Sequence, residues 1–185
     1  MKEDVIKSMK EKMDKAIATL KKELSRLRTG RASPALLENI RVDYYGTPTP
    51  LQQTASVTIP ESRLIVIQPW DKTLIDPISK AIQKSNLGIS PSTDGTVIRI
   101  SIPPLTEERR KDLAKLVKKI AEESKVGIRN IRREANEALK QLEKNKALSE
   151  DDSHRAVDEV QKITDRKIED VDKVAEEKQT EILEK

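Results

Sequence analysis

The distribution of proline and glycine constrains the fold of this chain more than any other feature of its sequence. All nine prolines lie between Pro34 and Pro104, and four of the five glycines lie between Gly30 and Gly95. Outside residues 30–104 the remaining residue of either type is Gly127. Proline stops an α-helix and glycine weakens one. We therefore expect helices at both ends of the chain and a compact mixed segment inserted between them.

The two flanking segments have the apolar spacing of long helices. Residues 2–28 and 106–146 each carry an apolar stripe at intervals of three or four, and a third stripe follows Ser149, which forms a capping-box pattern with Asp152. Stripes this narrow have to be buried against one another, which predicts a long antiparallel three-helix bundle. An oligomeric coiled coil is the alternative, and the short connection near 145–148 favours a hairpin. The residues expected to face the core are Ile6, Met9, Met13, Ile17 or Ala16, Leu20, Leu24, Leu27, Leu113, Val117, Ile120, Ser124, Ile128, Ile131, Ala135, Ala138, Leu142, Val157, Val160, Ile163 or Thr164, Ile168, Val171 and Val174.

The inserted segment has the pattern of strands around one helix. Four runs rich in β-branched residues predict strands, with a turn at 46–50, and Asp76-Pro77 is expected to start a helix that ends before Gly88. The predicted strands are 38–45, 55–60, 63–69 and 96–102, and the predicted helix is 77–86. The fold class is therefore predicted as α+β, a three-helix bundle with an inserted small β/α/β sandwich.

Two short crossings of the chain would join these parts. We predict one domain from residues 1–29 plus 105–185 and a second from residues 30–104. Thr29 and Gly30 form one crossing, and the run Pro103, Pro104 and Leu105 forms the other. Two adjacent short crossings can act as a hinge. A rigid elbow fits the same sequence equally well.

Composition excludes several classes of protein. Charged residues make up 37% of the chain, and it contains no Cys, no Phe and one His. No apolar run is long enough to span a membrane, and thiolate, disulfide and His-rich metal sites are excluded. Neither phosphate-binding loop pattern, GxxxxGK[ST] or GxGxxG, is present. We expect no catalytic site, no cofactor and no metal, and we interpret His154 as a surface residue. The mixed charges of the first residues match no targeting peptide, so the cytoplasm is the expected location.

The net charge of +4 hides an uneven distribution along the chain. Residues 109–133 carry ten basic and three acidic side chains, whereas residues 134–185 carry ten basic and sixteen acidic ones. Lys111, Lys115, Lys118, Lys125, Arg129 and Arg132 recur at helical spacing. We expect this stripe to face away from the bundle and to bind a phosphate backbone. A solvated face is the alternative, but Arg129, Arg132 and Arg133 repel one another unless an anion binds.

The aromatic residues all lie in the inserted segment. We expect Tyr44 or Tyr45 to be in the core and the other to flank a hairpin, although tyrosines can also stack on bases. Trp70 is expected in the core or at a domain interface.

Several motifs resemble those of the ribosome recycling factor family. They are RTGRASP (28–34), YYG (44–46), PWD (69–71), SNLG (85–88), PPLTEERR (103–110) and RNIRR (129–133), and they extend over nearly the whole chain in order. One departure is Gly127, where the family favours a small helix former such as Ala.

The resemblance implies a non-enzymatic translation factor with a three-helix bundle and an inserted domain, hinged into an L. Its partners would be the large ribosomal subunit and elongation factor G, without a membrane, and a monomer is expected. After termination it would bind ribosomal RNA, and GTP hydrolysis by elongation factor G would then split the subunits and free messenger and transfer RNA. The inserted domain would face elongation factor G. The predicted rRNA-binding residues are Arg28, Arg31, Arg110, Lys125, Arg129, Arg132 and Arg133, and the predicted hinge residues are Thr29, Gly30, Pro103, Pro104 and Leu105.

Overall fold

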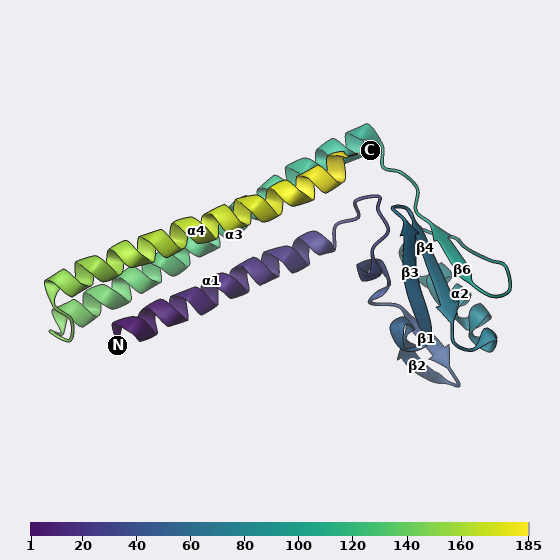
Figure 1. Ribbon diagram of the computed structural model, residues 1–185, viewed down its shortest axis with the longest axis horizontal. Helices are drawn as coiled ribbons and strands as arrows, with labels where there is room; N and C mark the ends of the chain where they lie inside the picture. The colour runs from purple at the N-terminus through teal and green to yellow at the C-terminus, as the bar shows by residue number, and fades with distance from the viewer. Residues whose placement is uncertain (185) are drawn as a thin grey trace. The chain divides into compact units, whose positions relative to one another are not determined.

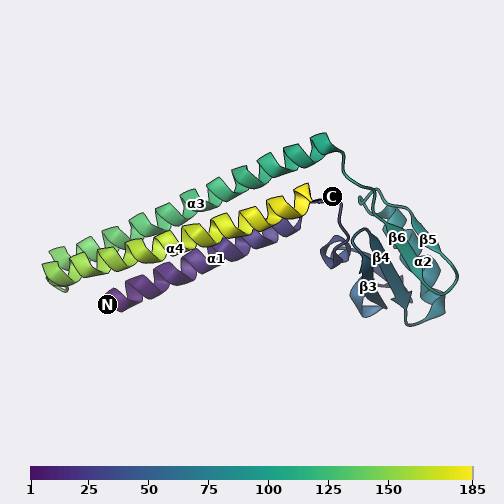
Figure 2. The same ribbon diagram turned by 45° about the horizontal axis from the view of Figure 1, so that its top comes forward.

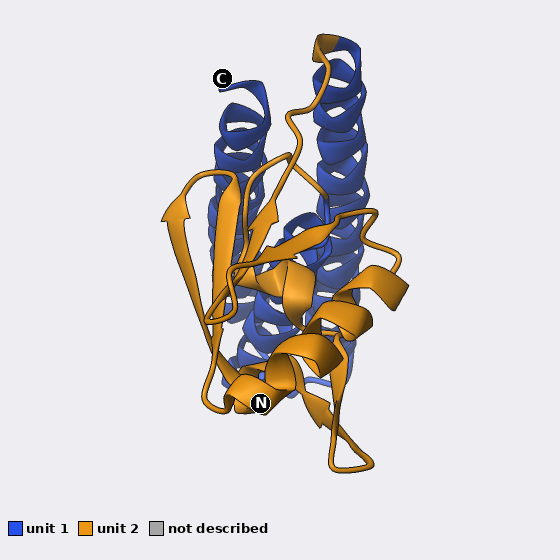
Figure 3. Ribbon diagram, turned by 90° about the vertical axis from the view of Figure 1, so that its right-hand side faces the viewer, with its two compact units in different colours: residues 1–27, 108–185 blue, residues 28–107 orange. Residues whose placement is uncertain are grey.

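The computed structural model describes residues 1–184 and forms two compact units. Unit 1 consists of Met1–Leu27 and Glu108–Lys185, and unit 2 is Arg28–Glu107 (Figure 3). Long helices in one unit and a small antiparallel sheet in the other confirm the predicted α+β class.

Unit 1 is built from three helices that lie side by side. They are α1 (Lys2–Ser25), α3 (Glu107–Lys144) and α4 (Glu150–Leu183). Helix α3 runs opposite to α1 and α4 (Figures 1 and 2). The ion pair between Lys12 and Glu134 joins α1 to α3, and Lys167 pairs with Asp14 to join α4 to α1. Lys125 pairs with Asp172 to join α3 to α4, so each helix contacts the other two, as in a bundle.

The core of unit 1 uses more small residues than the apolar stripes predict. Ala121 and Leu139 are buried in α3 although neither belongs to the predicted stripe, and Ile120 is only partly buried. In α4 the buried positions include Ser153, Ala156 and Ala175, whereas Val157, Ile168 and Val174 stay half-exposed. A helix between two neighbours presents a wide face to them, and small residues at its centre allow close approach.

The connection between α3 and α4 is a tight hairpin within one chain. Lys146 has a left-handed φ of 56°, its N–H bonds to Glu143 O at 2.9 Å, and the N–H of Ala147 bonds to Leu142 O at 2.9 Å. This pair of bonds is a Schellman motif, which ends α3. Ser149 then caps α4 by accepting a hydrogen bond from the Asp152 N–H at 3.1 Å, as the sequence predicts.

Unit 2 contains two antiparallel sheets, one α-helix and three short 3₁₀ turns. Strands β1 (Arg41–Tyr44) and β2 (Thr47–Pro50) form a two-stranded sheet. The four-stranded sheet has the order β3-β4-β6-β5 and contains β3 (Ala55–Glu61), β4 (Leu64–Pro69), β6 (Ile98–Ser101) and β5 (Pro91–Thr93). Helix α2 (Ile75–Lys84) buries Ile75, Ile78 and Ile82 in one core with Ile65, Ile67, Ile98 and Ile100.

The structure corrects three predictions about unit 2. Strand β2 lies within the predicted turn at 46–50, because an outer strand tolerates prolines without a ladder bond. Strand β5 is too short to show a pattern in the sequence. Helix α2 begins at Ile75 rather than Pro77, since a 3₁₀ turn, Lys72–Leu74, capped by the Asp71 side chain, leads directly into it.

The aromatic side chains are exposed, which contradicts the expectation of a core tyrosine and, of the two positions expected for Trp70, excludes the core. Tyr44, Tyr45 and Trp70 are 41%, 80% and 69% exposed. Val42 takes the inward position of β1, and the tyrosines lie where the chain reverses toward β2, with left-handed φ values of 49° at Tyr45 and 83° at Gly46.

Gly127 weakens α3 without any steric reason to be glycine. A Cβ added there would meet nothing within 4 Å outside its own helical turn. Alanine is about 1 kcal/mol more favourable than glycine in a helix interior. Gly127→Ala should therefore raise the free energy of unfolding by about 1 kcal/mol and the thermal midpoint by roughly 2–4 °C. Calorimetry measures both, and an unchanged or lower midpoint would contradict this account.

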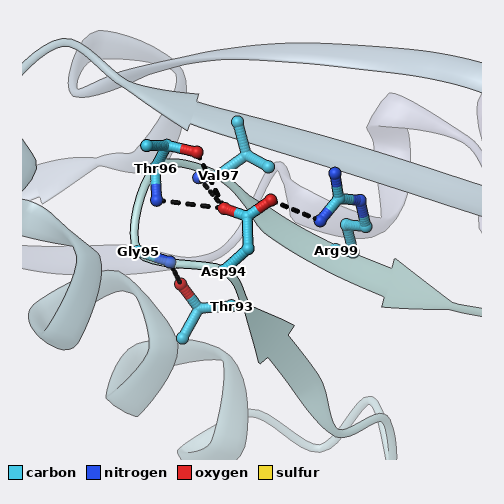
Figure 4. A network of polar contacts seen from close by, with 6 residues as sticks. All are labelled: Thr93, Asp94, Gly95, Thr96, Val97 and Arg99. Atoms are coloured by element: carbon cyan, nitrogen blue, oxygen red, sulfur yellow. Dashed lines mark hydrogen bonds and ion pairs between the residues drawn. The ribbon is translucent and has the colours of Figure 1, made fainter.

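The turn between β5 and β6 is organised by the Asp94 carboxylate. Asp94 Oδ1 accepts hydrogen bonds from the hydroxyl of Thr96 at 2.8 Å and from the N–H groups of Thr96 and Val97, and Asp94 Oδ2 pairs with Arg99 at 2.7 Å (Figure 4). The Thr96 hydroxyl, the Val97 N–H and Arg99 all favour the ionised form. Together they hold the pKa of Asp94 well below its ordinary value of 3.8.

A lowered pKa makes this turn sensitive to acid. Asp94 stabilises the folded state at pH values above its ordinary pKa, and that contribution is lost as the pH falls through the lower, folded-state pKa. NMR titration of the Asp94 carboxyl carbon should show ionisation persisting well below pH 3.8. Thr96→Val should raise this pKa, whereas Thr58→Val, whose hydroxyl contacts only a backbone carbonyl, should not. An ordinary pKa for Asp94 in the unmodified protein would refute the prediction.

Candidate nucleic-acid interface

Helix α3 contains all six residues of the predicted basic stripe. Lys111, Lys115 and Lys118 of the stripe are exposed, as are Lys119 and Arg133 beside it. Arg110, Lys125, Arg129 and Arg132 are half-buried. The stripe faces outward as predicted along its first half, but Lys125 and Arg132 contact α4. The prediction that the whole stripe faces away from the bundle is therefore wrong for Lys125 and Arg132. These two residues are seven positions apart and lie on the flank of α3 nearest to α4.

Lys125 is engaged within the bundle. Its side chain is only 14% exposed and forms ion pairs with Asp172 of α4 and, at 3.2 Å, with Glu122. The carboxylate of Asp172, with a smaller contribution from Glu122, raises the pKa of the Lys125 amine. Among the predicted rRNA-binding residues in α3, Lys125 therefore has the clearest structural role, which is to join α3 to α4.

Three arginines come together on one face of α3. Arg129, Arg132 and Arg133 are spaced i, i+3 and i+4, so their side chains are neighbours on the helix. Arg132 Nη1 donates to Gln161 Oε1 at 3.2 Å, and Arg133 Nη1 donates to Asn130 Oδ1 at 3.3 Å.

None of these three guanidinium groups forms an ion pair within residues 1–184. Arg129 also has no hydrogen-bond partner among those residues, and the partners of the other two are neutral amides. The nearest acid in the sequence, Glu134, pairs instead with Lys12 at 2.9 Å. We call Arg129, Arg132 and Arg133 the arginine cluster. It concentrates three positive charges that no acidic side chain within residues 1–184 pairs with.

The remaining predicted residues lie elsewhere. Arg110 is near the start of α3, nineteen residues or about 28 Å along the helix from Arg129. Arg28 belongs to unit 2, where its guanidinium donates to Asn86 O at 2.6 Å and to Leu87 O at 3.2 Å, just beyond the end of α2. Arg31, also in unit 2, is half-buried and has a polar partner. Arg28 therefore anchors the first crossing to the rest of unit 2.

The two predicted crossings meet within unit 2. Ala32 N–H bonds to Ser62 O at 2.7 Å and Ile102 N–H bonds to Arg63 O at 2.8 Å, so both chain segments are fixed to the turn between β3 and β4. Gly30 has a left-handed φ of 74°, and a Cβ there would lie 2.9 Å from Leu105 Cγ. Glycine is therefore required at position 30 for two reasons, its backbone conformation and the close approach of Leu105.

Two other features, a metal-ligating group and a membrane-spanning helix, are not found within residues 1–184. No group of three or more His, Cys, Asp or Glu within residues 1–184 is arranged to hold a metal ion. Over the same residues, no helix has the length and apolar character needed to cross a membrane. His154 is exposed, as the sequence suggests.

The comparisons with known proteins agree with the motifs. A family model described as ribosome recycling factor matches residues 20–183. The ribosome-recycling factor of Nitratidesulfovibrio vulgaris is 59% identical over 181 residues, which cover 98% of this chain and 97% of that protein. The corresponding protein of Syntrophomonas wolfei is 56% identical over 184 residues, with both chains covered completely.

The chain belongs to the ribosome recycling factor family.

Solved structures of ribosome recycling factors share the fold. A solution structure of a ribosome recycling factor has a TM-score of 0.76 and 44% identity, and the match covers 98% of this chain and 97% of that one. A second match, with a TM-score of 0.67 and 49% identity over both full chains, comes from models of the T. thermophilus ribosome recycling factor and E. coli elongation factor G bound to the E. coli post-termination complex.

The sequence does not indicate which residues hold the arginine cluster of this family member. Asn130 is recognisable afterwards, because it lies three residues before Arg133 on the same helix. Gln161 lies 29 residues from Arg132 along the chain, and only the pairing of α3 with α4 brings the two together.

Proposed function

We propose that this chain acts as a ribosome recycling factor. It binds the large ribosomal subunit after termination, and with elongation factor G and GTP hydrolysis it splits the post-termination complex and releases messenger and transfer RNA. Membership of the family supports this function, as does the related factor described together with elongation factor G on a post-termination complex. It is a translation factor rather than an enzyme, and we expect it to act in the cytoplasm, where ribosomes work.

The arginine cluster is the observation that carries the RNA-binding part of the proposal. Guanidinium groups match phosphate geometry with paired donors, and unneutralised charge on a stiff helix is available to a polyanion. Arg110 lies farther along the same helix and could extend the contact along an RNA backbone. Arg28 and Arg31 complete the proposed rRNA-binding set in unit 2.

The two domains would have different roles. The helical domain, predicted as residues 1–29 with 105–185, would supply the main rRNA-binding arm. The inserted domain, predicted as residues 30–104, would face elongation factor G. Unit 2 extends from Arg28 to Glu107, so Arg28 and Arg31 would add RNA contacts from the inserted side of the crossings. The crossings at Thr29–Gly30 and Pro103–Leu105 would form the hinge. The energy for splitting would come from the GTP of the partner, since the sequence contains no phosphate-binding loop pattern.

Co-sedimentation with isolated large ribosomal subunits tests the proposed function. Binding should weaken steeply between about 50 and 200 mM salt, because each phosphate contact releases counterions. A splitting assay with elongation factor G and GTP should then show dependence on this chain. Binding that is absent at both salt concentrations would reject the function. Salt-insensitive binding would favour a scaffold that contacts proteins through its helical faces.

A further inference from the structure

A short chain of hydrogen bonds connects the arginine cluster to α4. Gln161 Oε1 accepts from Arg132 Nη1 at 3.2 Å, while Gln161 Nε2 donates to Asp165 Oδ1 at 2.8 Å. Gln161 and Asp165 are one helical turn apart on α4, so both face the same flank of α3.

The Asp165 carboxylate determines which end of the Gln161 amide meets the arginine. An ionised carboxylate only accepts hydrogen bonds, so it holds the amide nitrogen of Gln161 on its own side. The amide oxygen is then directed toward Arg132, whose guanidinium has only donors. Without Asp165 the amide could rotate and present its own donors to the guanidinium.

A neutral partner has a specific consequence for Arg132. Gln161 accepts from Nη1 alone among the five N–H donors of a guanidinium, and it adds no negative charge. The contrast is Lys125, whose amine is paired with the carboxylates of Asp172 and Glu122. Arg132 is therefore held in place while its charge stays available to an anion.

We propose that Gln161 is a positioning residue for Arg132, which fixes the guanidinium in advance for a phosphate of ribosomal RNA. This inference rests on the proposed function. Ordering a long, rotamer-rich side chain opposes binding, and a side chain that is already held removes that cost. Gln161 acts through Arg132 and need not touch the RNA itself.

The test compares Gln161→Met with Gln141→Met in binding to large ribosomal subunits. Methionine keeps the length and shape of glutamine and removes both polar ends. Gln141 is a matched control, because its amide donates to Glu137 at 2.9 Å within α3 and contacts no arginine. Gln161→Met should weaken binding about three- to tenfold, and Gln141→Met should leave it unchanged. The thermal midpoints of both variants should stay close to that of the unmodified protein.

A double-mutant cycle separates positioning from general damage. In the Arg132→Ala background, Gln161→Met should have no further effect on affinity, because no guanidinium remains to be held. Nitrogen NMR of the free protein gives an independent readout. Rotation about the Nε–Cζ bond of Arg132 should be slower in the unmodified protein than in Gln161→Met.

The outcomes distinguish this inference from the proposed function. If Arg132→Ala weakens binding and Gln161→Met does not, Gln161 has no positioning role while the RNA contact stands. An equal loss from Gln161→Met in both backgrounds would show that the residue acts independently of Arg132. If neither variant affects binding, Arg132 is not an rRNA contact, and the positioning role of Gln161 is rejected with it.

Discussion

Arg132→Ala is expected to weaken binding to large ribosomal subunits about thirtyfold, the effect of removing an arginine hot spot worth about 2 kcal/mol. The guanidinium of Arg132 has a neutral partner and no ion pair within residues 1–184. Its removal therefore takes away charge that a phosphate would use, and the loss to the bundle itself is a single hydrogen bond with an exposed glutamine. Co-sedimentation at several salt concentrations measures the affinity. The slope of the logarithm of the binding constant against the logarithm of the salt concentration should become shallower by the amount expected for about one phosphate contact.

Lys125→Ala is the control for this variant because it removes the same charge from the same helix. Its amine is already paired with Asp172 and Glu122, so binding should change much less than in Arg132→Ala. Loss of the contact between α3 and α4 should instead lower the free energy of unfolding by up to about 1 kcal/mol. Equal losses of binding in the two variants would show that total charge matters rather than the arginine cluster.

Gly30→Pro is expected to slow subunit splitting on the order of tenfold, while binding to the large subunit changes little. Proline fixes φ near −65°, whereas Gly30 has a φ of 74° and lies against Leu105. The preceding residue, Thr29, would also be restricted to extended conformations. The substitution would therefore redirect and stiffen one of the two crossings that form the proposed hinge, without touching α3. Parallel measurements of binding and of splitting with elongation factor G and GTP test this separation.

Gly95→Pro is a suitable control for damage to unit 2. Gly95 also has a left-handed φ, of 88°, and its N–H donates to the Thr93 hydroxyl at 3.1 Å, so proline is unfavourable there as well. It lies in the turn between β5 and β6, away from both crossings. If Gly95→Pro slows splitting as much as Gly30→Pro does, the effect comes from general destabilisation and the hinge role is wrong.

Local patterns determined the helices and most of the strands. The position of every proline and of all glycines but Gly127 in the middle of the chain can be read from the sequence directly, as can the three- and four-residue spacing of apolar positions. Ser149 is an example, since its capping role needs nothing beyond Asp152 three residues later. The same holds for Arg129, Arg132 and Arg133, which share a face wherever α3 forms a helix.

Predictions of burial from the sequence were wrong where the surroundings of a residue depend on segments far away in the chain. Tyr44 and Trp70 look like core residues by type, but the core of unit 2 is filled by isoleucines from α2 and the sheet. The buried alanines of α4 lack a strong apolar signal, because their burial depends on how closely the other helices approach.

The basic stripe shows most clearly what the sequence determines and what only the tertiary structure decides. Helical spacing alone determined that its lysines and arginines lie along α3, and the charge count alone indicated an anionic partner. Only the packing of α3 against α4 decided that Lys125 is paired with Asp172 while Arg132 is held by a neutral Gln161. Periodicity specifies which face of a helix a side chain occupies. Which residue lies opposite that side chain depends on the register between the two helices, and that register is set by the packing of all the side chains between them.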